Sequence, residues 1–173
     1  MIPRLIGLSL SILVCHSFQS HDLTREDFRV GGVHLDQPID SALQVLGRLN
    51  RIDTTITEAG NFAGYSFDGM TIWVNTARTI SAIDISSNSY RTRKGVTIGD
   101  SLSTIEQLYG VKKEWAREKE LGRMYEIYDT TFSDFDFLFD YEFRTSDYDA
   151  CYIAFYFKSN RVVKIYMWRG LTD

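Results

Sequence analysis

Proline, cysteine and histidine are scarce in this chain of 173 residues, which contains 2 Pro, 2 Cys and 3 His. With 44% hydrophobic and 24% charged residues, this composition excludes a low-complexity or collagen-like chain and indicates a globular one. The formal net charge is −4, so the basic excess of a general nucleic-acid-binding protein is missing. The one basic cluster, Arg91, Arg93 and Lys94, is interpreted as a solvated linker. We therefore expect no nucleic-acid partner.

The sequence also lacks G-x-S-x-G, H-E-x-x-H, P-loop, G-x-G-x-x-G and C-x-x-C motifs. An EF-hand loop starting at Asp134 would need an oxygen ligand and a glycine where Leu138 and Phe139 stand. We therefore expect no catalytic residues, no cofactor and no metal. Two alternatives stay open: a calcium site built from separate strands, and a Ser/His/Asp triad formed in space around a residue such as His34.

The N-terminus has the layout of a secretory signal peptide. Arg4 precedes an apolar run over 5–14, and polar residues follow from His16. This run is shorter than the roughly 20 residues of a membrane-spanning helix, so we predict export to the periplasm or the extracellular space, a signal peptide over 1–17 and no stable membrane span. The alternatives are a buried N-terminal helix and a lipid-anchored envelope form modified at Cys15. Cleavage after Ser17 leaves Cys151 as the single cysteine, which excludes an intrachain disulfide and predicts a buried hydrophobic residue.

An internal repeat organises the rest of the chain. Residues 32–47 align without gaps with 95–110, with identities at Gly32, Val33, Gln44 and Gly47 and with matching apolar positions. Each segment predicts a short strand that leads into an amphipathic helix, which a glycine ends. Pro38 suits the first helical position, and Asp100 suits the N-cap of the second helix.

Strands are predicted after each helix. Residues 54–57, 65–67, 70–74 and 79–85 follow the first helix, with a hairpin at Asp68-Gly69. Residues 112–117, 124–129, 134–143, 151–158 and 162–168 follow the second, with a turn at Ser159-Asn160. The predicted fold is α+β, with two tandem helix-plus-meander repeats over 28–90 and 91–173 that pack together.

This glycine-led strand, short helix and antiparallel meander resemble the unit shared by the β-lactamase inhibitor protein and the SmpA/OmlA-type outer-membrane-assembly lipoproteins, over about 28–168. The tandem order resembles the inhibitor. The resemblance implies an exported protein that binds other proteins through its sheet and loops rather than one that catalyses. Two departures are the missing disulfides of the inhibitor and the missing small residues before Cys15 of the lipoproteins.

The segment 131–149 distinguishes the second repeat. Aromatic residues alternate with acidic ones, so a strand would place Phe135, Phe137, Phe139, Tyr141 and Phe143 on one face and Asp134, Asp136, Asp140 and Glu142 on the other. One interpretation is a solvated face that protects a sheet edge. The other is an acidic patch that attracts a basic protein.

Several aromatic residues are predicted to face away from the helices: Trp73, Tyr152, Tyr156, Tyr166 and Trp168. Tyr and Trp are enriched in protein interfaces, although cross-strand stacking explains such residues too. Together these patterns predict an exported, non-enzymatic protein-binding or inhibitor-like module that docks through its sheet. The alternatives are a periplasmic enzyme or ligand-binding protein with a cleft between the repeats, and a structural envelope lipoprotein.

Overall fold

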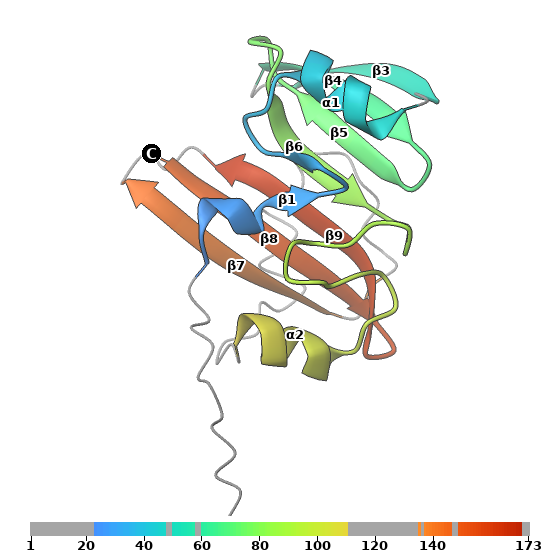
Figure 1. Cartoon of the computed structure of the whole chain (residues 1–173), viewed down its shortest axis with the longest axis vertical. Helices are drawn as coiled ribbons and strands as arrows, with labels where there is room; N and C mark the ends of the chain where they lie inside the picture. The colour runs from blue at the N-terminus through green and yellow to red at the C-terminus, as the bar shows by residue number, and fades with distance from the viewer. Residues whose placement is uncertain are drawn as a thin grey trace, which may run out of the picture.

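The computed structural model describes residues 23–47, 50–57, 60–110, 135, 137–146 and 149–170. Its main element is one antiparallel sheet of seven strands, and two short α-helices pack on it (Figure 1). The fold is therefore α+β, as the sequence predicts. The helices α1 (Ile39–Leu46) and α2 (Leu102–Tyr109) have the predicted positions, and left-handed backbone at Gly47 and Gly110 ends both.

The seven strands lie in the order β3-β4-β5-β6-β9-β8-β7. Their bounds are β3 Arg51–Thr57, β4 Gly60–Phe67, β5 Met70–Val74, β6 Ile80–Ile85, β7 Phe137–Ser146, β8 Asp149–Lys158 and β9 Arg161–Gly170. A central pairing of β6 with β9 joins the two parts of the chain into one sheet, with Ala82 opposite Trp168 and Ile83 opposite Met167. A separate ribbon pairs β1 (Arg29–Val30) with β2 (Val33–His34) and follows a 3-10 helix, η1 (Arg25–Asp27).

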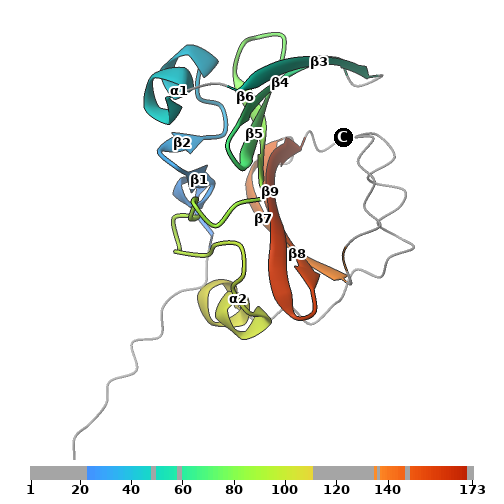
Figure 2. The same cartoon turned by 90° about the vertical axis from the view of Figure 1, so that its right-hand side faces the viewer.

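Both helices, the small ribbon and the connection between β6 and α2 lie on the same side of the large sheet (Figure 2). Alternation along the strands points apolar side chains towards them, as in β5, where Met70, Ile72 and Val74 are buried and the intervening residues are partly exposed. The core on this side includes fully buried residues from helices, strands and connections: Val33, Ile39, Ile72, Ile83, Val96, Ile105, Phe155 and Ile165. We call the opposite side of the sheet the far face.

The segment before each helix is hydrogen-bonded to the start of a central strand. Before α1, Asp36 N donates to Ile80 O at 2.8 Å, and Ile80 N donates to Gln37 O at 3.0 Å. Before α2, Gly99 N donates to Val162 O at 2.8 Å, and Val162 N donates to Asp100 O at 2.9 Å. Each helix is thereby fixed at the first residues of β6 or β9.

Capping of α2 differs from the prediction. Ser101 is the N-cap, and its hydroxyl accepts the Thr104 backbone N–H at 3.3 Å. Asp100 precedes this N-cap by one residue, and its carboxylate instead accepts the backbone N–H of Thr97 at 2.9 Å. Pro38 also stands one place earlier than expected, at the N-cap position of α1.

Turn chemistry is confirmed at both predicted hairpins. Gly69 has a φ of 75° between β4 and β5, and Ser159 and Asn160 have φ of 50° and 62° between β8 and β9. The strand expected at 134–143 begins later, since β7 spans Phe137–Ser146. The strands predicted at 112–117 and 124–129 lie outside the described residues.

Candidate binding surface

The far face carries a row of side chains that crosses five strands in register. Trp73 of β5 lies opposite Ala82 of β6, which lies opposite Trp168 of β9. Trp168 lies opposite Tyr152 of β8, and Tyr152 lies opposite Glu142 of β7. We call these five residues the aromatic row. Four of its members were predicted as binding residues at separate places in the sequence, and strand pairing brings them into one line.

Ring contacts hold one end of the aromatic row. The Trp168 ring stacks on Tyr152 with centroids 4.9 Å apart and planes 14° apart, and it stacks on Tyr166 at 5.4 Å and 26°. The Tyr152 hydroxyl donates to a Glu142 carboxylate oxygen at 3.4 Å. Partial burial, followed by the nearby Glu142 charge and its hydrogen bond, raises the pKa of Tyr152. The stacked rings are thus prearranged before any partner arrives.

Two glycines make room for the aromatic side chains. A Cβ on Gly64, which pairs with Trp73, would lie 3.0 Å from the Trp73 ring. A Cβ on Gly170 would lie 2.5 Å from the Tyr152 ring. The positions of both rings therefore depend on the absence of a side chain on the neighbouring strand.

A small second core lies beside the aromatic row on the far face. It consists of the buried residues Ala82, Leu138, Ala154, Tyr156 and Tyr166. Tyr156 is 1% exposed and Tyr166 is 8% exposed, so the expectation that these two tyrosines face outward as contact residues is wrong. The sequence places them on the correct side of the sheet, but alternation within a strand does not reveal that this side also has a core. Trp73, Tyr152 and Trp168 are partly exposed.

Phe135 also departs from its prediction. It precedes β7 and packs edge to face on Tyr156, with centroids 4.9 Å apart, so it belongs to the far-face core. Phe139 and Tyr141 pack on the helix side, as their alternation predicts. The alternation of side chains between the two faces therefore starts only at the first residue of β7.

An ion pair lies on the far face next to this core. Lys164 Nζ is 2.6 Å from an Asp84 carboxylate oxygen, and each side chain is 22% exposed. The Lys164 ammonium lies 5.8 Å from the Tyr156 ring centroid and 5.7 Å from that of Tyr166. Burial raises the pKa of the Asp84 carboxyl, and the Lys164 charge opposes this shift. This pair was not predicted from the sequence. Asp84 stands between the buried Ile83 and Ile85, so alternation along β6 points its carboxylate to the far face.

The acidic face predicted from the sequence is described only in part. Asp134 and Asp136 lie outside the described residues. Asp140 is partly exposed on β7. Glu142 is exposed, and its carboxylate lies 2.6 Å from the Arg144 guanidinium. At this position the predicted patch is therefore an ion pair rather than an isolated negative charge.

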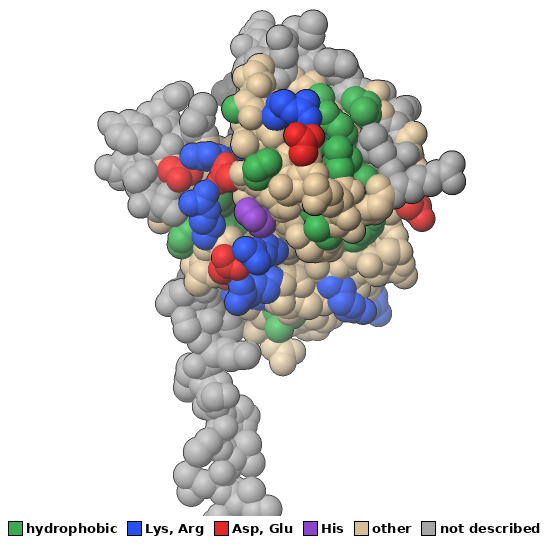
Figure 3. Space-filling view, turned by 45° about the horizontal axis from the view of Figure 1, so that its top comes forward, with side chains coloured by type: hydrophobic (Ala, Val, Ile, Leu, Met, Phe, Trp, Pro, Cys, Tyr) green, Lys and Arg blue, Asp and Glu red, His purple; other side chains and the backbone are tan. Residues whose placement is uncertain are grey.

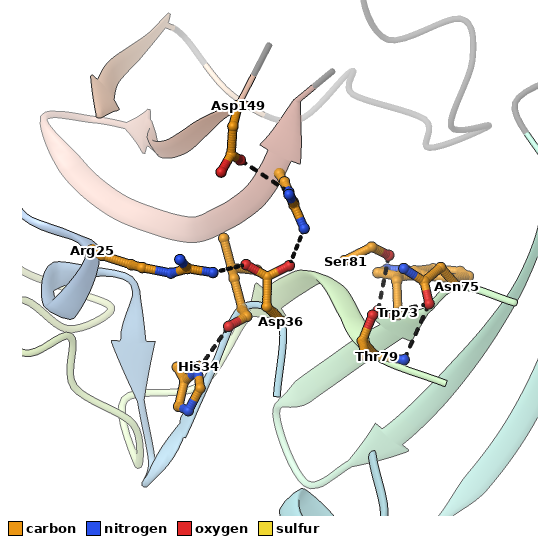
Figure 4. A network of polar contacts seen from close by, with 10 residues as sticks. Arg25, His34, Asp36, Trp73, Asn75, Thr79, Ser81 and Asp149 are labelled. Carbon is orange, nitrogen blue, oxygen red and sulfur yellow. Dashed lines mark hydrogen bonds and ion pairs between the residues drawn. The ribbon is translucent and has the colours of Figure 1, made fainter. Parts of the chain in front are cut away.

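A polar network fixes the edges of this region (Figure 4). The Ser81 hydroxyl donates to the Trp73 carbonyl at 3.1 Å. The Asn75 side-chain oxygen accepts both the backbone N–H and the hydroxyl of Thr79, each at 3.1 Å. These bonds close the connection between β5 and β6 and hold the backbone that carries Trp73.

Asp36 forms the centre of the other network in Figure 4. Its carboxylate bridges Arg25 of η1 and Arg169 of β9, and Arg169 also pairs with Asp149 of β8 at 3.0 Å. The first and last described elements are therefore joined by charge.

Lys and Arg side chains gather on the face of the molecule that Figure 3 shows. Arg29 and Arg93 share the Glu26 carboxylate at 3.0 and 2.9 Å. In the predicted basic linker, Arg91 donates to the Gly95 carbonyl, and Lys94 donates to the Leu108 carbonyl and lies over the Tyr109 ring. These linker cations thus make contacts within the fold.

The thiol of Cys151 and the imidazole of His34 were considered in the sequence as possible reactive groups. Cys151 is 4% exposed and free, and burial raises its pKa to about 11, so its thiol stays protonated at neutral pH. His34 Nδ1 lies 2.7 Å from the carbonyl oxygen of the next residue, Leu35. Within the part of the chain that is described, no three His, Cys, Asp or Glu side chains are grouped so that they could hold a metal ion.

No protein-family model matches this chain, and no curated protein matches its sequence. Among solved structures, it is similar to an extracellular protein containing an SCP domain from Bacillus anthracis str. Ames, with a TM-score of 0.49 and 9% identity over 97% of this chain and 50% of that one. The chain thus spans half the length of that protein. It is also similar to the uncharacterized protein yfeY from Escherichia coli, with a TM-score of 0.44 and 17% identity over 83% of this chain and 97% of that one. None of the described helices has the length and apolar composition required to cross a bilayer.

Proposed function

We propose that this protein is an exported, non-enzymatic protein-binding or inhibitor-like module that docks a protein partner through the aromatic row of its far face. The observation that carries the proposal is the row itself. Trp73, Trp168 and Tyr152 lie in register on three strands, are partly exposed, and occupy the side of the sheet away from the helices. Trp and Tyr in such central positions contribute most of the binding free energy in many protein interfaces.

The geometry supports docking without covalent change. Trp168 and Tyr152 are stacked, Trp73 is fixed through its backbone, and the Asp84–Lys164 pair lies on the same face. A surface that is ordered before binding loses less conformational entropy in the complex. Glu142, at the end of the aromatic row, and Asp140 of the same strand are acidic groups that can set the orientation of a basic partner.

Export and repeat origin belong to the same proposal. The sequence of residues 1–17 supports export. Two tandem repeats over 28–90 and 91–173 are supported by corresponding bonds: the backbone of His34 donates to the Gln37 side chain, and that of Thr97 donates to the Asp100 side chain. The bonds from Asp36 and Gly99 to the starts of β6 and β9 also correspond in the repeat alignment.

Retention from an envelope extract of the protein's own organism tests the docking surface. The chain from Phe18 is immobilised as wild type and as Trp73→Ala/Trp168→Ala. We expect the wild type to retain one protein, and the double variant to bind it at least tenfold more weakly, because truncating a central Trp typically costs about 2 kcal/mol or more.

Val45→Ser is the matched control, because Val45 is an apolar residue of α1 that is 55% exposed on the helix side. It should leave retention unchanged. Circular dichroism confirms that each variant is folded. The proposal fails if the double variant retains the same protein as the wild type, or if the control loses retention equally.

A further inference from the structure

The two edges of the large sheet are built differently. Among the described strands β7 forms one edge, and it carries Asp140, Glu142 and Arg144 and has a register irregularity between Arg144 and Ser146. Charges and bulges of this kind protect an edge from pairing with another strand. The opposite edge of the described sheet is β3, which pairs with β4 without a register irregularity and carries its charges, Arg51 and Asp53, in its first half.

The second half of β3 has no charge and no residue that disfavours strand pairing. The β3 sequence is Arg-Ile-Asp-Thr-Thr-Ile-Thr, so its last four residues are β-branched and uncharged, and it contains no proline, glycine or lysine. All seven residues pair with β4 in an unbroken register from Arg51–Ser66 to Thr57–Gly60. Among the described strands, β4 is the neighbour of β3 and the other side of β3 is unpaired.

An exposed apolar side chain marks the same strand. Ile52 is 54% exposed, and Val45 of α1 is the other large hydrophobic residue that is exposed within the described parts of the chain. Figure 1 shows α1 and β3 at the same end of the sheet. Among the described strands β3 is an edge strand, and an edge strand with an exposed Ile is a template for adding another strand.

We infer that two copies of this chain pair edge to edge through β3, antiparallel and about a two-fold axis at Thr54, so that their sheets become continuous. This inference is independent of the proposed function. A two-fold contact uses the same surface on both copies, which requires a strand that complements itself.

The sequence of β3 meets this requirement in one full-length register. With the axis at Thr54, all seven residues take part: Arg51 lies opposite Thr57, and Ile52 lies opposite Ile56 of the second copy. Asp53 then lies opposite Thr55, so no like charges meet. With the axis at Asp53, two aspartates would lie directly opposite each other, which destabilises a strand pair.

Sedimentation velocity over a concentration series tests the association. It uses the chain from Phe18, which retains every described residue. We expect a monomer–dimer equilibrium for the wild type. Thr54→Lys places two lysines opposite each other at the axis and should raise the dimer dissociation constant at least tenfold. Thr145→Lys on β7 is the matched control and should leave the equilibrium unchanged.

Oxidative cross-linking tests the register. Directly opposite residues of an antiparallel pair have Cα atoms about 4.5–5.5 Å apart, which a disulfide can span. Thr54→Cys should therefore give a disulfide-linked dimer. Thr57→Cys should not, because its two copies would lie about 20 Å apart. The wild type, whose Cys151 is buried, serves as the unlinked control.

Three results would overturn the inference. One is a wild type that stays monomeric at the highest concentration, and another is a dimer that Thr54→Lys leaves intact. The third is a cross-link through Thr57→Cys in place of Thr54→Cys. Circular dichroism of Thr54→Lys separates loss of association from loss of folding.

Discussion

At the scale of single residues, Gly69 and Gly95 both have left-handed backbone, but they differ in the room available for a side chain. Gly69 has a φ of 75° in the β4–β5 hairpin, and a Cβ there would lie 2.0 Å from the Ser87 Cβ. Gly95 has a φ of 93°, and a Cβ there would meet nothing within 4 Å. Gly69 is thus required for both its conformation and its lack of volume, whereas Gly95 is required for its conformation alone.

Gly69→Ala and Gly95→Ala separate these two causes. Gly95→Ala should lower the free energy of unfolding by about 1 kcal/mol through backbone strain. Gly69→Ala should lower it by about 1–3 kcal/mol more, because Ser87 and its backbone must also move. Urea denaturation of both variants measures the difference, and equal losses would contradict the steric explanation.

At the scale of elements, the pairing of β6 with β9 holds the two parts of the sheet together. The Asp84–Lys164 pair joins these strands on the far face, next to the buried rings of Tyr156 and Tyr166. A charge pair that has lost much of its water is costly to break on one side, whereas replacing both partners by apolar groups can be nearly neutral.

A double-mutant cycle tests this junction. Lys164→Met should lower the free energy of unfolding by about 1–3 kcal/mol at pH 7, because it removes the ammonium that compensates the Asp84 carboxylate. The variant Asp84→Ala/Lys164→Met should be within about 1 kcal/mol of the wild type. Additive losses in the cycle would show that the two side chains do not act as a pair.

The destabilisation caused by Lys164→Met should depend on pH with a defined sign. Burial raises the pKa of Asp84 in the folded protein above its usual value of 3.8. Lowering the pH therefore protonates this carboxyl in the native state, and the neutral acid no longer needs the ammonium. The loss caused by Lys164→Met should shrink as the pH falls through the folded-state pKa of Asp84. If Lys164→Met instead lost more stability as the pH fell, burial would not be the cause of the raised pKa of Asp84.

At the scale of the whole molecule, the Asp36 carboxylate connects η1 with the last strand. It is 19% exposed and pairs with Arg25 and Arg169, which are 57% and 39% exposed. A carboxylate shared by two guanidiniums and partly shielded from water is a better stabiliser than an isolated surface pair. Asp36 has a φ of 66°, which Asn also tolerates.

Asp36→Asn should therefore lower the free energy of unfolding by about 1 kcal/mol, and 1 M NaCl should remove most of the difference by screening. Asp40→Asn is the control, because the Asp40–Arg78 pair is 70% and 61% exposed and should contribute little. Chemical denaturation at low and high salt measures both. Equal effects of the two substitutions would refute a special role for the network.

Local patterns in the sequence determined both described helices, both hairpin turns, the side of the sheet on which the apolar residues of β5, β8 and β9 lie, and the buried state of Cys151. These features depend on neighbours within a few residues: helical periodicity, left-handed glycines, turn residues and strand alternation. The same alternation placed Trp73, Tyr152 and Trp168 on one side of the sheet, although it gave no distance between them.

Tertiary structure alone decided which strands meet. The β6–β9 pairing aligned Trp73 with Trp168 and brought Asp84 to Lys164, and the second core on the far face buried Tyr156 and Tyr166. It also fixed the start of α2, because the Asp100 carbonyl accepts the Val162 backbone N–H. Such outcomes depend on contacts between residues far apart in the chain, and local periodicity carries no information about those contacts.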